Sequence, residues 1–316
     1  MADVLYIVVP CYNEEEVLPE TSARLKEKMS GLIAAGSIAE NSRVLFVNDG
    51  SRDKTWQIIS QLHDADPLFS GLKLSRNRGH QNALLAGLMT AKQYADMVIS
   101  MDADLQDDID AIDQFVARYY EGNDIVYGVR SSRATDTAFK RGTAQGFYKF
   151  MRLLGVDIVD NHADYRLMSK RALEALSQYS EVNIFLRGIV PQLGFPTAIV
   201  TYERKERFAG ESKYPLKKML SFAFDGITSF SVKPIRFVTV LGVVLFIFSL
   251  FMLIYALITK ILGHTVAGWS TLMGSIWMIG GIQLLCLGLI GEYVGKVYSE
   301  VKRRPRYIIE SFLNEE

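Results

Sequence analysis

The pattern of hydrophobic and polar positions divides the chain into an alternating N-terminal part and a strongly apolar C-terminal part. Up to about Tyr202, short β-branched runs alternate with longer amphipathic stretches. The short runs are typical of strands and cover Val4–Pro10, Val44–Asn48, Leu72–Ser75, Met97–Asp102 and Asp124–Val129. The stretches between them predict helices over Glu15–Ala35, Lys54–Ala65, Gln81–Tyr94 and Ile109–Tyr120. This alternation predicts an α/β fold with a doubly wound, mostly parallel sheet, in which ligands bind outside the C-terminal ends of the strands.

Beyond Arg204 the pattern becomes that of a membrane protein. Tyr214–Phe230 has apolar residues at helical spacing with lysines on the other side, which is typical of a helix in the membrane interface. A surface helix packed on a core has the same pattern. Phe237–Thr259 and Val266–Gly291 carry no charge, and each is long enough as a helix to cross a hydrocarbon core of roughly 30 Å. The alternative is a buried pair of helices in a soluble protein.

Basic residues flank this apolar part on both outer sides, so by the positive-inside tendency the two spans form a hairpin with both flanks in the cytoplasm. The N-terminus has no secretory signal pattern, which predicts a cytoplasmic N-terminal domain. The predicted organisation has an α/β domain, an interface helix region, two membrane spans and a basic cytoplasmic tail. These regions cover residues 1–212, 213–234, 235–293 (spans at about 237–259 and 266–291) and 294–316.

Composition narrows the functional classes. The 35 basic and 35 acidic side chains give no net charge, which argues against a nucleic-acid-binding protein, and the mean hydropathy of +0.12 agrees with lipid contact. The two cysteines, Cys11 and Cys286, provide neither a disulfide framework nor a metal-binding Cys/His spacing. Neither a dinucleotide-binding glycine motif nor a P-loop occurs.

Polar residues follow four of the predicted strands, at the edge where an α/β sheet binds its ligands. The clusters are Pro10–Glu15, Asn48–Ser51, Ser75–Asn77 and Asp102–Asp104. Asn, Asp, Ser and Gly also favour ordinary turns and helix caps, so each cluster alone has a structural explanation. Four clusters at one edge favour a binding site.

The fourth cluster points to a divalent cation. An apolar strand ends here in Asp102-Ala103-Asp104, and hard cations such as Mg²⁺ or Mn²⁺ take carboxylate ligands when they neutralise a diphosphate. The following acidic residues, Asp107, Asp108 and Asp110, are expected to form the first turn of the next helix, where they complement the helix dipole.

Two further segments fit a nucleotide and its phosphates. In Asn48–Thr55, Asp49 has the chemistry to accept a hydrogen bond from a base N–H group, and Gly50 permits close backbone approach. Arg207, Ser212 and Lys213 surround a glycine just before the apolar part, and they suit a diphosphate or a lipid phosphate. The alternative for this segment is a basic juxtamembrane patch attracted to anionic lipid.

These motifs together resemble the family 2 inverting glycosyltransferases, and more narrowly the polyprenyl-phosphate glycosyltransferases. That group contains bactoprenol glucosyltransferases and dolichyl-phosphate mannose synthases. The resemblance runs in order over nearly the whole chain and rests on Pro10–Glu15, Val47–Thr55, Asp102–Asp107, Arg207–Tyr214 and the C-terminal hairpin. It implies an A-type glycosyltransferase fold, Mg²⁺ or Mn²⁺ as cofactor, and a nucleotide sugar and polyprenyl phosphate as substrates.

The resemblance also implies roles for individual residues. Those assigned to the nucleotide sugar are Pro10, Tyr12, Asn13, Glu14, Asp49, Ser51, Asp102 and Ala103. Those assigned to phosphate are Arg207, Ser212, Lys213 and Arg130, although Arg130 equally well faces solvent. Asp102 and Asp104 would hold the metal, with Asp104 also given a catalytic role.

Asp164 stands where the family has its candidate catalytic carboxylate. A lipid phosphate is already largely ionised near pH 7, so Asp164 either acts as a base or orients the substrates, and Arg166 is a candidate structural partner. The chain departs from the family pattern at Ala163, Arg78 and His80, which concerns the sugar pocket. His80 is expected to be a helix-start residue.

The predicted function is transfer of a sugar, with inversion, from a UDP-hexose such as UDP-glucose or UDP-N-acetylglucosamine to polyprenyl (undecaprenyl) phosphate at the cytoplasmic membrane face. A homo-oligomer is compatible with this function. One alternative is a processive membrane polysaccharide synthase, but those enzymes usually carry an Arg-Trp pair, and this chain has none. Another is a non-catalytic membrane partner that keeps a nucleotide-binding fold.

Overall fold

The computed structural model describes residues 2–130, 162–182, 186–203 and 268–314, with scattered positions and short runs between 235 and 262. The chain forms two compact units. The first contains every strand among the described residues and also takes in the C-terminal segment from Arg304, whereas the second contains α10 (Trp269–Lys302). The predicted interface helix lies outside the described residues, and the predicted span at 237–259 is described only in part, at helical positions broken by gaps.

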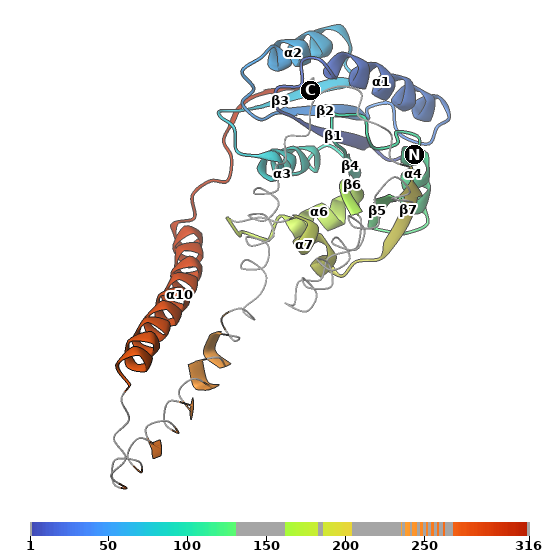
Figure 1. The fold of residues 1–316 in the computed structure, drawn as a ribbon. Coiled ribbons are helices and arrows are strands. Elements are labelled where there is room, and N and C mark those ends of the chain that lie inside the picture. The colour runs from blue at the N-terminus through green and yellow to red at the C-terminus, as the bar shows by residue number, and fades with distance from the viewer. Residues whose placement is uncertain are drawn as a thin grey trace. The chain divides into compact units, whose positions relative to one another are not determined.

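The first unit is built on an eight-stranded sheet with the order β7-β5-β6-β4-β1-β2-β3-β8 (Figure 1). Five strands were expected from the sequence, and each lies within a few residues of its predicted place: β1 (Leu5–Cys11), β2 (Arg43–Asn48), β3 (Phe69–Leu74), β4 (Met97–Ser100) and β5 (Ile125–Arg130). Strands β4, β1, β2 and β3 pair in parallel, so their C-terminal ends lie at one edge of the sheet.

The other three strands make the sheet mixed. β6 (His162–Ser169) inserts between β4 and β5 and is antiparallel to both. β7 (Thr197–Tyr202) pairs in parallel with β5, and β8 (Ile309–Leu313) pairs antiparallel to β3. The prediction of an α/β fold with a mostly parallel sheet is confirmed, because four of the seven pairings are parallel.

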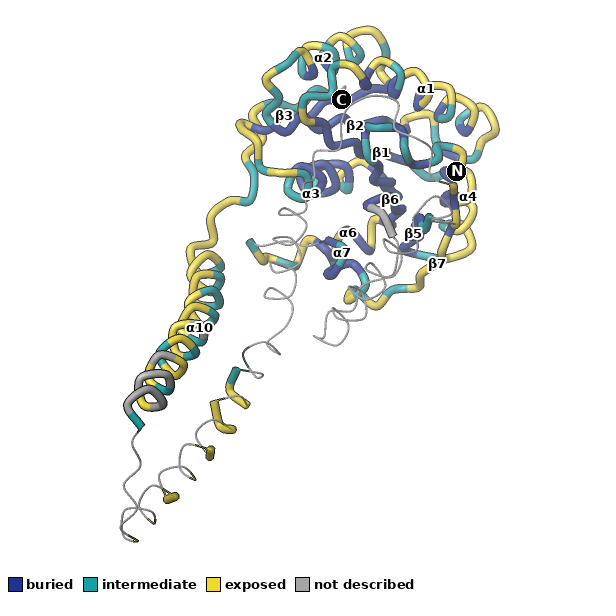
Figure 2. The backbone as a smooth tube through the Cα atoms, in the orientation of Figure 1, coloured by how far each residue is buried: buried dark blue, intermediate teal, exposed yellow. Residues whose placement is uncertain are grey.

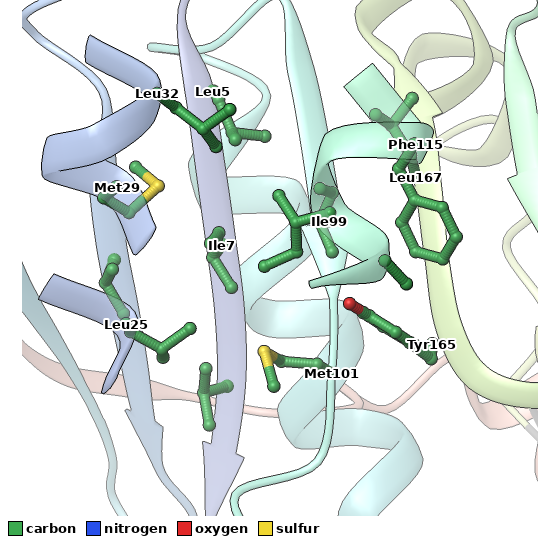
Figure 3. Packing of buried hydrophobic residues seen from close by; sticks show 14 of the residues in the cluster. Leu5, Ile7, Leu25, Met29, Leu32, Ile99, Met101, Phe115, Tyr165 and Leu167 are labelled. Carbon is green, nitrogen blue, oxygen red and sulfur yellow. The ribbon is translucent and has the colours of Figure 1, made fainter. Parts of the chain in front are cut away.

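Helices cover both faces of the sheet. α1 (Leu18–Ala34), α2 (Thr55–Ala65) and α4 (Ala111–Tyr120) contribute to one hydrophobic cluster with the strands, and Figure 3 shows α1 side chains beside those of β1. α3 (His80–Ala91) packs on the strand residues that point the other way: a Cβ at Gly87 would lie 2.3 Å from Cγ1 of Val8. The inner strands and most of α3 are buried (Figure 2), whereas the outer strands β7 and β8 are largely exposed or half-buried. The short elements α6 (Lys170–Leu176), α7 (Leu186–Ile189) and η1 (Val190–Leu193) follow β6 in the chain.

The C-terminal residues differ from the predicted tail at 294–316. α10 continues to Lys302, and β8 then joins the sheet of the first unit. A short edge strand after a basic segment has little apolar patterning of its own, so no clear strand signal is present here. Among the described residues, one helix is long and apolar enough to cross a membrane, at Met278–Lys302, which begins and ends later than the predicted second span.

Candidate active site

The loops after β1 and β2 are joined to each other by hydrogen bonds. The backbone N–H of Asn13 donates to Oγ of Ser51 at 3.0 Å, and Oδ1 of Asn13 accepts from the N–H of Arg52 at 2.9 Å. The N–H of Glu14 donates to Oγ1 of Thr55 at 2.9 Å. Asn13 has a positive φ of 54°, a conformation that Asn tolerates better than most residues. Asn13 and Ser51 thus fix the shape of this edge, whereas the neighbouring Tyr12 stays 38% exposed.

Asp49 is buried at the end of β2 and holds the loop that precedes α3. Its Oδ1 accepts from the N–H of Arg78 at 2.6 Å, and its Oδ2 accepts from the N–H of Gly79 at 2.8 Å. Gly50 is needed for this approach, because a Cβ there would lie 2.5 Å from the backbone nitrogen of Asn77. Burial raises the pKa of Asp49 although these N–H groups oppose the shift. From the sequence, Asp49 is predicted to accept a hydrogen bond from the base of the nucleotide. In the structure, its carboxylate also holds the loop before α3.

The carboxylates after β4 gather at the same edge. β4 ends at Ser100, so Asp102 and Asp104 lie in the loop beyond it, while Ala103 is buried with its carbonyl accepting from Oγ1 of Thr21 at 2.8 Å. Asp102 is half-buried. Burial raises the pKa of Asp102 to about 6, with further increases from Asp107, Asp164 and Asp104, while His80 opposes the shift.

Asp107 does not belong to the first turn of the next helix, and that expectation is wrong. α4 begins at Ala111, and Asp107 is buried with Oδ1 accepting from the hydroxyl of Tyr202 at 2.5 Å and from Arg130 at 3.4 Å. Asp107 therefore joins the loop after β4 to β7 and β5. Arg130, which was assigned to phosphate or solvent, has this carboxylate as its partner.

Asp164 is buried and has cationic and amide donors on both of its oxygens. Oδ1 accepts from Nη2 of Arg166 at 2.7 Å and from Nε of Arg187 at 3.2 Å. Oδ2 accepts from Nη2 of Arg187 at 3.0 Å and from Nε2 of Gln81 at 3.2 Å. Burial alone would raise the pKa of Asp164, but Arg187, His80 and Arg166 outweigh it and hold the pKa well below its usual range. Asp164 is thus a stable anion.

His80 links this carboxylate to the loop after β4. Its Nε2 lies 3.5 Å from Oδ2 of Asp164 and 3.6 Å from Oδ1 of Asp102. Burial disfavours the charged imidazole, but Asp164 and Asp102 outweigh that effect and raise the pKa of His80. His80 is the first residue of α3, as expected, and it also faces both carboxylates.

The structure therefore brings Asp102 and Asp164 to one place and adds residues that sequence reasoning did not assign to the site. These are His80, Gln81 and Arg187. Arg166 was a candidate structural partner of Asp164, and the structure places its Nη2 2.7 Å from Oδ1 of that carboxylate. Arg207, Ser212 and Lys213 lie outside the described residues.

The arrangement suits a cation that shares its ligands with a substrate. Within the described part of the chain, no group of three or more His, Cys, Asp or Glu side chains is arranged to hold a metal ion by itself. Mg²⁺ usually keeps several waters and binds through one or two carboxylates plus substrate phosphates. Asp102 and Asp104 fit this type of site. Burial, and then the neighbouring carboxylates, raise the pKa of Asp102, and a positive ion would favour its ionised form.

Sequence comparisons find two families along the chain. The profile described as "Glycosyl transferase family 2" matches residues 6–177, and that described as "GtrB C-terminal hairpin" matches residues 233–297. The chain is 61% identical to the "Uncharacterized glycosyltransferase YkoT" of Bacillus subtilis, covering 97% of this chain and 91% of that protein. It is 40% identical to the "Prophage bactoprenol glucosyl transferase homolog" of Escherichia coli, covering 96% and 97%. A mannosyltransferase structure from Pyrobaculum calidifontis, in complex with GDP-Man and Mn²⁺, aligns with a TM-score of 0.45 at 13% identity over 96% of this chain and 86% of that one.

Proposed function

The chain belongs to glycosyl transferase family 2 and is a glycosyltransferase, and from this premise we propose that it transfers a hexose from a UDP-sugar to polyprenyl phosphate. The bactoprenol glucosyl transferases that are about 40% identical over almost the whole chain support this acceptor. The observation that carries the proposal is the group of carboxylates at the C-terminal end of β4, beside the buried anion Asp164.

The proposed reaction is a direct displacement with inversion. An oxygen of the lipid phosphate attacks the anomeric carbon, the bond from that carbon to the diphosphate breaks, and UDP leaves with the bonding electrons. Asp102 and Asp104 would hold Mg²⁺ or Mn²⁺, which supplies the positive charge that stabilises the departing diphosphate. The loops carrying Asn13, Ser51 and Asp49 would bind the nucleotide, because they lie at the ends of β1 and β2, next to β4 in the sheet.

The reaction needs no strong base. A phosphate monoester has a second pKa of about 6 and is largely ionised near neutral pH. Asp164, whose pKa is held low by its cationic partners, is a poor proton acceptor. These properties favour an orienting role for Asp164 over a role as general base.

The connectivity supports a membrane hairpin. The GtrB C-terminal hairpin match and the apolar α10 indicate membrane association. Strands β7 and β8 belong to one sheet, although the apolar part of the chain lies between them in the sequence. Any chain that leaves this unit and returns to it must cross a membrane an even number of times, as a two-span hairpin does. The positive-inside tendency then favours the cytoplasmic face for the site.

Activity with a defined acceptor tests the proposal. The purified full chain in detergent is incubated with undecaprenyl phosphate, Mg²⁺ or Mn²⁺, and a panel of UDP- and GDP-sugars, and products are identified by mass spectrometry. We expect a lipid-phosphate hexose from one UDP-sugar and none in the presence of EDTA. Transfer only from a GDP-sugar would contradict the proposed donor, and no product from any donor would contradict the function.

A further inference from the structure

We propose that Arg187 contacts the phosphate of the lipid acceptor, and that Asp164 is a positioning residue that holds the Arg187 guanidinium in place. This inference rests on the proposed function, because it assigns a residue to that acceptor. In this proposal Asp164 does not act as a general base. It anchors Arg187, whose positive charge binds the acceptor phosphate.

The first support is the number of hydrogen bonds that the Asp164 carboxylate already accepts. Its side chain is only 5% exposed, and each of its oxygens accepts at least two hydrogen bonds from Arg166, Arg187 and Gln81. A carboxylate has about four lone-pair sites, so little acceptor capacity is left for a substrate proton. The position is therefore better suited to holding cations than to taking up a proton.

The second support is the contrast between the two partners of this ion pair. Arg187 engages Asp164 through Nε and Nη2, a two-point contact that fixes the plane of the guanidinium. Its side chain is nevertheless 41% exposed. The carboxylate thus lies inside the protein, and the arginine extends from it to the surface, where a ligand can reach it.

The third support is that hydrogen bonds from Gln81 hold the start of α7 beside Asp164. The Nε2 of Gln81 donates to Asp164, while its Oε1 accepts from the backbone N–H of Leu186 at 3.1 Å, the residue before Arg187. Gln81 thereby holds both the backbone beside Arg187 and the carboxylate that orients its side chain. Preorganised donors of this kind bind anions without first losing conformational freedom.

The fourth support is the order of strands along the sheet. Asp49 ends β2 and Asp102 follows β4, while Asp164 lies on β6, which is the neighbour of β4 on the side away from β1 and β2. If the nucleotide base of the donor lies near β2 and its diphosphate near β4, then its sugar and the attacking acceptor lie near β6, the next strand of the sheet. The sugar is neutral, and the acceptor phosphate is the anion that matches a guanidinium.

Kinetics and binding of Arg187→Ala test the inference. The probe is farnesyl phosphate, with UDP-sugar as donor in the transfer assay and without donor in equilibrium dialysis. We expect the KM and Kd for farnesyl phosphate to rise about 10- to 100-fold, as for loss of a charge-assisted hydrogen bond, while the Kd for UDP stays the same. Arg187→Lys keeps the positive charge but loses the two-point contact of a guanidinium, so it should bind farnesyl phosphate more tightly than Arg187→Ala and less tightly than the wild type.

Arg171→Ala is the matched control. Arg171 also makes a two-point contact with a carboxylate, that of Asp124, and its side chain is 63% exposed. This pair lies at the end of β6 opposite to Asp164. Its removal should leave farnesyl phosphate binding unchanged. Equal weakening by both variants would overturn the inference, because it would indicate a general loss of positive charge.

A double-mutant cycle separates positioning from base catalysis. If Asp164 acts through Arg187, then Asp164→Asn and Arg187→Ala should raise the acceptor KM without additivity, and the pH profile of kcat should keep its shape. An additive effect, with kcat at saturating acceptor about 100-fold or more lower in Asp164→Asn, would identify a base and overturn the inference. UDP binding by each variant checks that it is folded.

The outcomes for the two proposals differ. If wild-type protein transfers sugar but Arg187→Ala binds farnesyl phosphate normally, the inference fails and the proposed function stands. If wild-type protein transfers no sugar but its farnesyl phosphate binding depends on Arg187, the phosphate contact stands and the proposed function fails.

Discussion

The carboxylate of Asp49 is bonded to the backbone of Gly79, whose N–H donates to Oδ2 at 2.8 Å, immediately before α3 begins at His80. The same carboxylate accepts from the N–H of Arg78. The end of β2 therefore determines where α3 starts, and with it the position of the His80 imidazole near Asp102 and Asp164. The loops after β1 and β2, which are proposed to bind the nucleotide, and the carboxylates after β4 form one connected structure.

Asp49→Asn should lower both stability and nucleotide affinity. The amide replaces one acceptor with a donor, so either Arg78 or Gly79 loses its partner, at a cost of about 1–3 kcal/mol in unfolding free energy. Thermal unfolding and calorimetric titration with UDP measure the two effects. Asp66→Asn is the control, because Asp66 accepts from the N–H of Leu68 just before β3, which is the end of the strands opposite to Asp49. It should lower stability alone, and a loss of UDP affinity there would contradict a local role for Asp49.

Asp104→Asn should weaken metal-dependent transfer. If Asp104 is a metal ligand, removing its charge should lower the rate of sugar transfer by about 100-fold or more at fixed Mg²⁺, as for other groups that stabilise developing charge. Mn²⁺ binding, followed by electron paramagnetic resonance, provides a measurement that is independent of turnover. Asp113→Asn removes a surface carboxylate paired with Lys28 and should leave both quantities unchanged. Normal Mn²⁺ binding by Asp104→Asn would remove Asp104 from the metal site.

The sequence predicts the parallel half of the sheet well, for a physical reason. β1, β2 and β4 are buried on both faces, so each appears as a continuous apolar run that ends in turn residues. β6 was missed because it carries Asp164 and Arg166 within the strand, which hides the apolar pattern. The sequence also predicts correctly that Asp49 and Asp102 lie just beyond strand ends, because both strands are recognisable.

The remaining contacts of the site depend on tertiary structure. Gln81 meets Asp164 and Leu186 only because β6 inserts beside β4, and Arg187 meets Asp164 for the same reason. These contacts join residues far apart in the chain, so no spacing of residues in the sequence predicts them. His80 illustrates the limit: its place at a helix start was predictable, but the two carboxylates that it faces were not.

Metal affinity should depend on pH through Asp102. The pKa of this carboxyl is raised to about 6 in the protein, so protons compete with a cation below that pH. Lowering the pH from 7 to 5 should therefore weaken Mn²⁺ binding, with the steepest change near pH 6. The sign for the metal-free fold is opposite, because a raised pKa means that protonation of Asp102 stabilises the folded state as the pH falls. Mn²⁺ titrations at several pH values measure the first effect, and Asp102→Asn should abolish the step near pH 6. A step that persists in this variant would belong to another group.

Removal of the C-terminal strand should affect the active-site edge as well as stability. The N–H of Ser75 donates to the carbonyl of Ile308 at 3.0 Å, directly before the loop that Asp49 holds, and Phe312 lies beside the ring of Tyr94. A chain that ends at Arg304 should lose at least about 2 kcal/mol of unfolding free energy, because it exposes the edge of β3 and loses these contacts. It should also show a higher KM for the sugar donor. Glu310→Gln, which breaks only the surface ion pair with Lys73, should cost less than about 1 kcal/mol and leave KM unchanged. Thermal unfolding and donor kinetics on both variants provide the comparison, and an unchanged donor KM in the shortened chain would limit β8 to a structural role.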